Sequence, residues 1–235
     1  MKIQKNAFGT PKVFIIIPCY NEGGVLKSVL ESLIPLGNPL VAVDDGSKDD
    51  TWEIIQALPV YGLRHSVNLG QGAALQTGMS FALSRGADLI VHFDADGQHQ
   101  PQEIPQFVQP LLEGKAEAVL GSRFLRKQDA AKVPLAKRVL LRGAILVNHL
   151  LTGLSLSDAH NGFRAFTREA AAKIMLRENR YAHATEIIQQ IRAQPIRYIE
   201  MPTEIHYSKY SLAKGQSFWN SFNILIDLFL KGMFR

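Results

Sequence analysis

The stretch ADLIVHFDADGQHQ, residues 87–100, joins an apolar run to two acidic residues that stand two positions apart. The run reads as a buried strand, and Asp94 and Asp96 follow where that strand is expected to end. Two carboxylates held this close repel each other and raise each other's pKa, so a bound cation is the usual reason for such an arrangement. A hard divalent cation with oxygen ligands is the first candidate.

The segments on either side of this stretch repeat one pattern, in which a short apolar strand is followed by a helix. Strands are expected at residues 12–18, 39–47, 61–66, 88–96 and 116–123, and helices at residues 23–34, 49–58, 70–86 and 101–114. This alternation predicts an α/β fold with a mostly parallel, Rossmann-like sheet and helices on both faces.

Polar residues gather at the expected ends of four of these strands. In parallel sheets the ligand sits outside the carboxyl ends of the strands, so their convergence predicts an active site. The residues are Tyr20, Asn21, Glu22, Asp44, Asp45, Asn68, Asp94 and Asp96. A dinucleotide site is not expected, because Leu75 takes the place of the third glycine of the fingerprint, and a P-loop motif is missing as well.

Composition narrows the class of protein. Hydrophobic residues make up 46% of the 235 residues and charged residues 20%, as in soluble globular proteins. The single cysteine, Cys19, rules out an internal disulfide and fits a reducing cytoplasm. The polar N-terminus does not read as a signal peptide, and no run reaches the ~18–20 apolar residues of a membrane span.

Basic residues are concentrated in one part of the chain. Between residues 123 and 142, Asp129 is the one acidic residue beside seven basic ones: Arg123, Arg126, Lys127, Lys132, Lys137, Arg138 and Arg142. This stretch is either a solvated helix face or a surface that faces phosphates or anionic lipid. We expect no nucleic-acid partner.

Four motifs in order, IIIPCYNEGGVL, VAVDDGSKDDT, NLGQGAALQTG and HFDADGQHQP, resemble the family 2 glycosyltransferases with the GT-A fold. The later motifs GSRF, SDAHNGFRAF, HATEII and EMPTEIHYSKYSLAKGQS are similar to those of the polyprenyl-phosphate sugar transferases, the dolichol-phosphate mannose synthase type. The resemblance covers roughly residues 12–217. It implies a GT-A domain over residues 1–216 and leaves an amphipathic helix at residues 217–235.

The resemblance also implies a reaction, the inverting transfer of a sugar from a nucleotide-diphosphate sugar such as GDP-mannose or a UDP-sugar. Mg²⁺ or Mn²⁺ would stabilise the leaving diphosphate, with Asp94, Asp96 and Gln98 as oxygen ligands. His92 and His99 are left out of that set, because a hard cation prefers oxygen. The donor nucleotide would contact Pro18, Tyr20, Glu22, Asp44, Asp45, Asn68, Gly70 and Asp94. Gln71 stands where many relatives carry lysine, which leaves the identity of the nucleobase of the donor open.

The acceptor decides which further residues matter. A phosphate acceptor is already an anion and needs cations to place it, for which the candidates are Arg123, Arg164, Lys209 and Lys214. A sugar acceptor needs a general base, for which Asp158 or Glu186 is the candidate. The residues expected to take part in catalysis are therefore Asp96, Arg123, Asp158, Arg164 and Glu186.

Two apolar segments with basic residues, 136–154 and 217–235, favour a lipid acceptor, because such helices lie at membrane surfaces. A helix packed on the domain or on another subunit explains them equally well, so a homo-oligomer or a membrane-protein partner stays open. The leading hypothesis is a polyprenyl-phosphate sugar transferase, cytoplasmic and peripheral at the inner face of the cell membrane. The alternatives are a family 2 transferase that extends a cell-surface polysaccharide or glycan, a sugar-1-phosphate nucleotidyltransferase, and a non-catalytic nucleotide-binding or membrane scaffold subunit.

Overall fold

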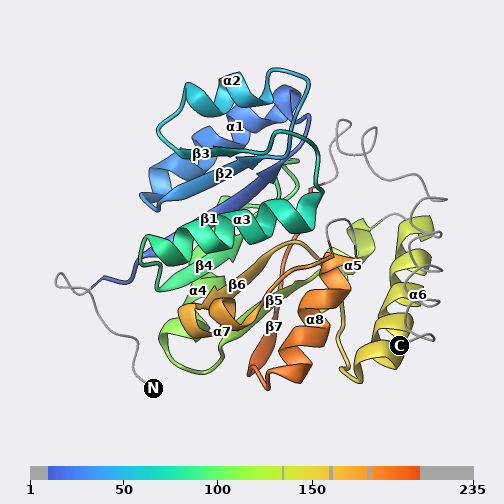
Figure 1. Cartoon of the computed structure of the whole chain (residues 1–235). Helices are drawn as coiled ribbons and strands as arrows, with labels where there is room; N and C mark the ends of the chain where they lie inside the picture. Colours follow the sequence, from blue (N-terminus) through green and yellow to red (C-terminus); the bar gives the residue numbers. More distant parts are fainter. Residues whose placement is uncertain (1–9, 134, 159–160, 179–181, 207–235) are drawn as a thin grey trace.

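The protein is described by a computed structural model over residues 10–133, 135–158, 161–178 and 182–206 (Figure 1). The elements in chain order are β1 (Val13–Cys19), α1 (Gly23–Leu33), the 3-10 turn η1 (Ile34–Leu36), β2 (Leu40–Asp44), α2 (Thr51–Gln56), β3 (Tyr61–Arg64), α3 (Gln71–Ser84), β4 (Leu89–His92), the 3-10 turn η2 (Pro101–Glu103), α4 (Ile104–Leu112), β5 (Ala118–Ser122), α5 (Lys127–Lys132), α6 (Leu135–Thr152), β6 (Arg164–Thr167), α7 (Arg168–Lys173), α8 (His183–Ala193) and β7 (Tyr198–Pro202).

These strands form one sheet in the order β3-β2-β1-β4-β6-β5-β7. The pairs β1–β2, β1–β4, β2–β3 and β5–β7 are parallel, whereas β6 runs antiparallel to both β4 and β5. The register places the ends of the parallel strands side by side, with Cys19 opposite Asp44 and Asp44 opposite Arg64. The loops after β1, β2, β3 and β4 therefore emerge at one edge of the sheet.

The core consists of two layers of apolar side chains, one on each face of the sheet. In β1, Ile15 and Ile17 pack toward α1 and α4, while Phe14 and Ile16 pack toward α3 and α8, because successive side chains of a strand point to opposite faces. β1 is buried on both faces, which explains why its sequence is a continuous apolar run rather than an alternating one. Figure 1 shows α1 and α3 on opposite sides of this strand.

The predicted α/β fold with a mostly parallel sheet and flanking helices is confirmed, with differences in detail. β4 ends at His92, so Asp94 and Asp96 lie in the loop after the strand and not within it. The sequence pattern did not reveal β6 or β7. β6 has only four residues, all of them buried and including Arg164, which hides the apolar pattern of a strand.

Segment 136–154, expected to be helical, coincides closely with α6. Of the helices that the structure describes, none combines the length and the apolar composition that crossing a membrane requires. The predicted helix at 217–235, together with Lys209 and Lys214, lies outside the described residues.

Candidate functional site

The loops after β1 and β2 are tied together by hydrogen bonds at the sheet edge. The Asn21 backbone N–H donates to Ser47 Oγ at 2.9 Å, and the Asn21 side-chain oxygen accepts from the Lys48 backbone N–H at 2.8 Å. The Glu22 backbone N–H donates to Thr51 Oγ1 at 2.8 Å, which joins the start of α1 to that of α2. The polar residues that follow these strands are thus brought together, as the sequence predicted.

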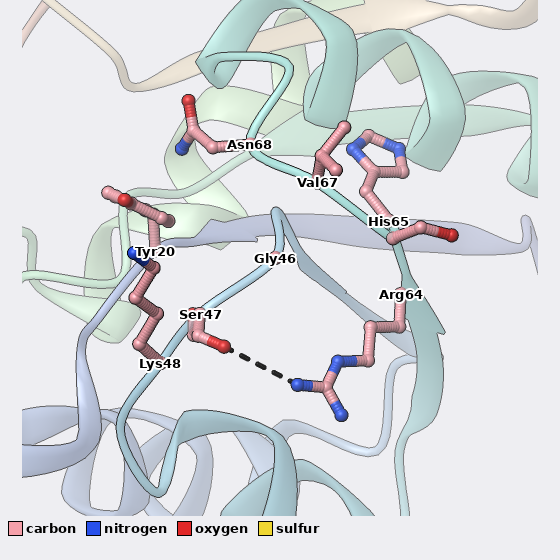
Figure 2. A pocket seen from close by; sticks show the side chains of 9 residues that line it. Tyr20, Gly46, Ser47, Lys48, Arg64, His65, Val67 and Asn68 are labelled. Carbon is pink, nitrogen blue, oxygen red and sulfur yellow. Dashed lines mark hydrogen bonds between the residues drawn. The ribbon is translucent and has the colours of Figure 1, made fainter.

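A cavity of about 650 Å³ opens between the loops that follow β1, β2 and β3 (Figure 2). Its lining comprises Tyr20, Gly46, Ser47, Lys48, Arg64, His65, Ser66, Val67 and Asn68. Figure 2 shows Tyr20 and Lys48 along one side and Arg64 along the other. Tyr20 is 40% exposed, and Pro18 lies half-buried in β1 two residues before it. The cavity therefore offers an aromatic ring, two cations and an amide, which suits a planar polar group with an anionic tail.

Tyr20 and Asn68 were expected to share a pocket, and the structure places both in its lining. The sequence pattern did not point to Ser47, Lys48, Arg64 and His65, which also line the cavity. The available signal was position, because each lies at or within a few residues of the end of β2 or β3.

Asp44 holds two residues of the cavity lining, Arg64 and Ser47, in place. Its side chain is fully buried, with Oδ2 at 3.0 Å from Arg64 Nε, and its Oδ1 accepts from the Ser47 backbone N–H at 2.9 Å. The Arg64 guanidinium also stacks over the Trp52 ring at 5.3 Å. Asp44 therefore orients Arg64 and Ser47, while a direct contact between Asp44 and a ligand stays a prediction.

Asp45 holds the loop that leads into α3. Its Oδ1 lies 2.7 Å from His65 Nδ1 and accepts from the Leu69 backbone N–H, while its Oδ2 accepts from the Gly70 backbone N–H at 2.7 Å. His65 Nε2 lies 3.0 Å from Thr77 Oγ1 in α3. Gly70 has a φ of 104°, a conformation that favours glycine. The buried carboxylate thus fixes the Gly70 turn, and its predicted contact with a nucleobase is not tested.

Asp94 is held by side chains from two different loops. Its Oδ1 accepts from Gln71 Nε2 at 3.0 Å, and its Oδ2 lies 3.3 Å from His99 Nε2. Burial works to raise the pKa of Asp94, but the hydrogen bond from His99 and the positive charge of Arg164 outweigh it and leave the pKa lowered. Asp94 is therefore a carboxylate at neutral pH. His99 and Gln71 orient it, a role that the sequence did not suggest.

Asp96 lies close to Asp94 and responds to its charge. Burial first, and then the charge of Asp94, raise the pKa of Asp96 to about 6, with a further contribution from Glu22. Asp96 Oδ1 accepts from the Gln98 backbone N–H at 3.0 Å, which orients the carboxylate and places Gln98 beside it. Glu22, Asp94 and Asp96 thus form a negative region, and a bound cation would reduce the repulsion between their charges.

The donor set fits Mg²⁺ or Mn²⁺ better than a softer metal. Asp94, Asp96 and Gln98 offer oxygen ligands, and the repulsion between the two carboxylates is the observation that favours a cation there. The described part of the chain has no group of three or more His, Cys, Asp and Glu side chains arranged around a metal position. A cation here would complete its ligands with water and phosphate oxygens, as Mg²⁺ does in nucleotide sites.

Two buried basic residues near Asp94 stand opposite each other on the neighbouring strands β4 and β6. Arg164 is 3% exposed and His92 is 1% exposed, and the two are register partners. Within the described ranges, Arg164 Nη1 and both His92 ring nitrogens lack a hydrogen-bond partner. Burial lowers the pKa of Arg164 to about 10 against the opposing charges of Asp94 and Asp158, so it stays charged. Burial also lowers the pKa of His92, to about 3, so His92 is neutral. Arg164 is therefore a cation with an available donor beside Asp94.

The two residues proposed as alternative bases are both engaged. Asp158 Oδ1 accepts from Arg123 Nη2 at 2.7 Å and its Oδ2 from Arg123 Nε at 2.5 Å, so the pair is bidentate and buried. Glu186 accepts from the backbone N–H groups of Arg177 and Glu178 at 2.9–3.0 Å. In this arrangement both carboxylates hold protein groups in place. A role of either as a base stays untested.

Comparison with known proteins places this geometry in context. The model of the family described as glycosyl transferase family 2 matches residues 14–175. The UDP-N-acetylglucosamine–dolichyl-phosphate N-acetylglucosaminyltransferase of Methanococcus voltae is 32% identical over 94% of this chain and 96% of its own length. The polyprenol monophosphomannose synthase of Mycolicibacterium smegmatis is 32% identical over 71% of this chain and 66% of its own length.

A solved structure is similar over nearly the whole chain. Glucosyl-3-phosphoglycerate synthase from Mycobacterium tuberculosis, in complex with Mn²⁺, UDP and glucosyl-3-phosphoglycerate, superposes with a TM-score of 0.63 at 18% identity. The similarity covers 94% of this chain and 80% of the synthase. At this identity the likeness establishes the fold, which is the GT-A fold expected from the sequence.

Proposed function

Because the chain belongs to glycosyltransferase family 2, we propose that this enzyme transfers a sugar from a UDP-sugar to a polyprenyl phosphate. The sugar that we place first is N-acetylglucosamine. The Methanococcus voltae enzyme, whose printed name gives that donor and a dolichyl phosphate acceptor, aligns with this chain nearly end to end. The relative named for mannose transfer aligns over a smaller share of both chains.

The observation that carries the assignment of phosphate-bearing substrates is the position of Arg164. Its buried guanidinium lies near the carboxylates of both Asp94 and Asp158, and its Nη1 has no partner in the described part of the chain. A buried cation with an unused donor fits a phosphate oxygen, which accepts strong charge-assisted hydrogen bonds. Arg164 therefore binds an oxygen of the diphosphate or of the acceptor phosphate.

The residues of this chain then have different roles in the proposed reaction. Tyr20 packs against the base, and Lys48 and Arg64 supply positive charge along the cavity. Asp94, Asp96 and Gln98 hold Mg²⁺ or Mn²⁺, which supplies Lewis-acid stabilisation of the leaving diphosphate when bound. His99 and Gln71 keep Asp94 in position.

Bond changes follow from the nature of the acceptor. An oxygen of the polyprenyl phosphate forms a bond to the anomeric carbon of the sugar, on the face opposite the nucleotide. The bond between that carbon and the diphosphate breaks, and its electron pair leaves with UDP. The attacking oxygen already carries negative charge, so no proton has to be removed and no general base is needed. The transfer inverts the anomeric carbon.

Transfer to a sugar hydroxyl is the second candidate function, and it would need Asp158 or Glu186 as base. It is favoured less, because Asp158 already binds Arg123 through both oxygens and Glu186 already accepts two backbone N–H groups.

The test is a donor panel with the full chain. UDP-N-acetylglucosamine, UDP-glucose and GDP-mannose are each incubated with Mn²⁺ or Mg²⁺, with and without a short polyprenyl phosphate, and release of the nucleoside diphosphate is measured. We expect UDP release that the lipid phosphate stimulates and that Asp96→Asn abolishes. Preference for GDP-mannose would overturn the proposed donor. Release of the nucleoside diphosphate that the lipid phosphate does not stimulate would overturn the proposed acceptor.

A further inference from the structure

Glu200, in the edge strand β7, is bonded to the point where the chain returns to the sheet after α6. The chain leaves β5 at Ser122, passes through α5 and α6, and comes back beside β5 at Ser157. The Glu200 carboxylate accepts from the Ser157 backbone N–H at 2.9 Å and from the Ser157 hydroxyl at 2.8 Å. It also accepts from the Asp158 backbone N–H at 3.3 Å. One carboxylate in β7 therefore holds both residues of this return.

The hydrogen bonds that continue from Glu200 run in one direction. An ionised carboxylate can only accept, so the Ser157 hydroxyl gives its proton to Glu200 and accepts from its other neighbour, Ser122 Oγ, at 2.6 Å. Ser122 Oγ in turn accepts from the Phe124 backbone N–H at 3.2 Å. The chain of donors therefore runs from Phe124 to Glu200. Arg123 lies between Ser122 and Phe124, so two of the bonded residues flank it.

The Arg123 side chain is fixed by a second route that also begins at Glu200. Its guanidinium donates to both oxygens of Asp158, from Nε at 2.5 Å and from Nη2 at 2.7 Å, and the Arg123 backbone N–H donates to Asp158 Oδ2 at 3.1 Å. Both partners are buried. Because Glu200 holds the backbone of Asp158, it also determines where this carboxylate meets the guanidinium.

The charges around Asp158 explain why the orientation of Arg123 matters to the candidate site. Asp158 and Asp94 both act on the charge of Arg164, so the Arg123–Asp158 pair borders the region that the phosphate groups of the substrates would occupy. A planar guanidinium binds phosphate with a defined direction, and a small rotation changes how well its donors meet the phosphate oxygens. Arg123 is a candidate for binding the acceptor phosphate, so its orientation should set the affinity for the acceptor.

We propose that Glu200 is a positioning residue for the acceptor: through its hydrogen bonds to residues 157 and 158 it fixes the Arg123 guanidinium in the orientation that binds the acceptor phosphate. The identity of the acceptor rests on the proposed function. The restraint on Arg123 stands on the hydrogen bonds described above, and it can be tested without turnover.

The test compares the full-length wild type with three variants. Glu200→Ala removes the acceptor of these hydrogen bonds, whereas Glu200→Gln keeps an amide oxygen in its place. Glu117→Ala is the matched control, because Glu117 also links β5 to β7, by accepting from the Arg197 backbone N–H at 3.1 Å. Glu117 precedes β5, so it lies at the opposite end of that strand from Arg123.

The first readout is hydrogen exchange of the Arg123 Nε–H, followed by heteronuclear NMR and assigned with Arg123→Lys. Exchange should be at least roughly tenfold faster in Glu200→Ala than in the wild type, because the buried pair opens more often when Asp158 is no longer held. Glu200→Gln and Glu117→Ala should exchange at nearly the wild-type rate. This readout requires no substrate.

The second readout is steady-state kinetics with a short polyprenyl phosphate at saturating UDP-N-acetylglucosamine. KM for the acceptor should rise roughly tenfold in Glu200→Ala, as expected for a weakened charge-assisted hydrogen bond, while kcat and the affinity for UDP change little. Glu200→Gln should restore the KM. If no acceptor supports turnover while exchange at Arg123 is faster in Glu200→Ala, the proposed function fails and the restraint on Arg123 stands.

Three results would overturn the proposal. Unchanged exchange at Arg123 in Glu200→Ala would mean that Glu200 does not restrain the guanidinium. An equal rise in the acceptor KM in Glu117→Ala would mean that any weakening of the contact between β5 and β7 has the same effect. A rise in KM in Glu200→Gln as large as in Glu200→Ala would assign the effect to the charge of Glu200 rather than to its hydrogen bonds.

A further variant keeps the test decisive if Glu200→Ala does not fold. Ser157→Ala removes the hydroxyl that joins Glu200 to Ser122 and leaves the backbone hydrogen bonds in place. It should change both readouts in the same direction as Glu200→Ala, by a smaller factor. Wild-type values of both readouts in Ser157→Ala would overturn the route through the hydroxyl chain.

Discussion

Gly162 lies so close to Asp94 that a Cβ atom at residue 162 would stand 2.0 Å from Asp94 Oδ2. The segment before β6 therefore crosses directly over the first carboxylate of the acidic pair. This contact joins two motifs that are far apart in the sequence, DAD at 94–96 and NGF at 161–163. Glycine is needed here for close approach of the backbone.

Gly162→Ala should displace Asp94 and lower turnover by roughly a hundredfold, because a shift of about 1 Å in a catalytic group has that order of effect. Gly143→Ala in α6 is the matched control, since a Cβ atom there meets nothing within 4 Å. The control should keep its activity, and its helix should be slightly more stable. Steady-state rates and circular dichroism of both variants provide the check, and an active, folded Gly162→Ala would show that Asp94 tolerates the shift.

Tyr20→Ala should weaken UDP binding about tenfold or more, because stacking of a base on an aromatic ring contributes ~1–3 kcal/mol. Tyr20→Phe keeps the ring and should bind nearly as wild type, while Tyr61→Ala removes an exposed tyrosine outside the cavity lining and should have no effect. Isothermal titration with UDP measures all three. Equal affinity in Tyr20→Ala and Tyr20→Phe would place the base somewhere else.

The sequence was sufficient to predict the parallel half of the fold, because β1, β2 and β4 are buried, mostly apolar runs and polar residues follow close behind each of them. The same logic expected Tyr20, Asn68 and the acidic pair at the ends of strands, and the structure has each of them in a loop that follows a strand. It could not find β6, whose four residues include a buried arginine, and it missed Lys48 and Arg64. Those two residues belong to the cavity only because β2 and β3 lie side by side in the folded sheet, which is a tertiary property.

Roles were harder to predict than positions. Asp44, Asp45 and Asp158 are acidic residues in motifs, but in the fold they are buried and bind protein groups. A carboxylate's hydrogen-bond partners depend on contacts distant in sequence, such as Asp158 with Arg123, and no local pattern reports them.

Asp158→Asn should destabilise the fold by ~3–5 kcal/mol, because it removes the charge that faces buried Arg123. Glu31→Gln is the matched control, since it breaks the exposed Lys27–Glu31 pair, whose charged atoms lie 4.0 Å apart, and should cost ~0–1 kcal/mol. Urea unfolding measures both. A loss of turnover in Asp158→Asn with wild-type stability would instead support the role of Asp158 as a base.

His92 should make the chain sensitive to acid. Burial lowers its pKa from 6.5 to about 3 in the folded protein, so between these values the unfolded chain binds a proton that the folded chain does not. The free energy of unfolding therefore falls as pH drops below 6.5, and the contribution of His92 is about 2 kcal/mol lower at pH 5 than at pH 7. His92→Leu removes this group, so the difference in unfolding free energy between wild type and variant should shift by that amount over the same interval. Urea unfolding of both proteins without added metal, at pH 7 and at pH 5, measures the shift, and a difference that stays constant would mean that His92 is protonated inside the folded chain.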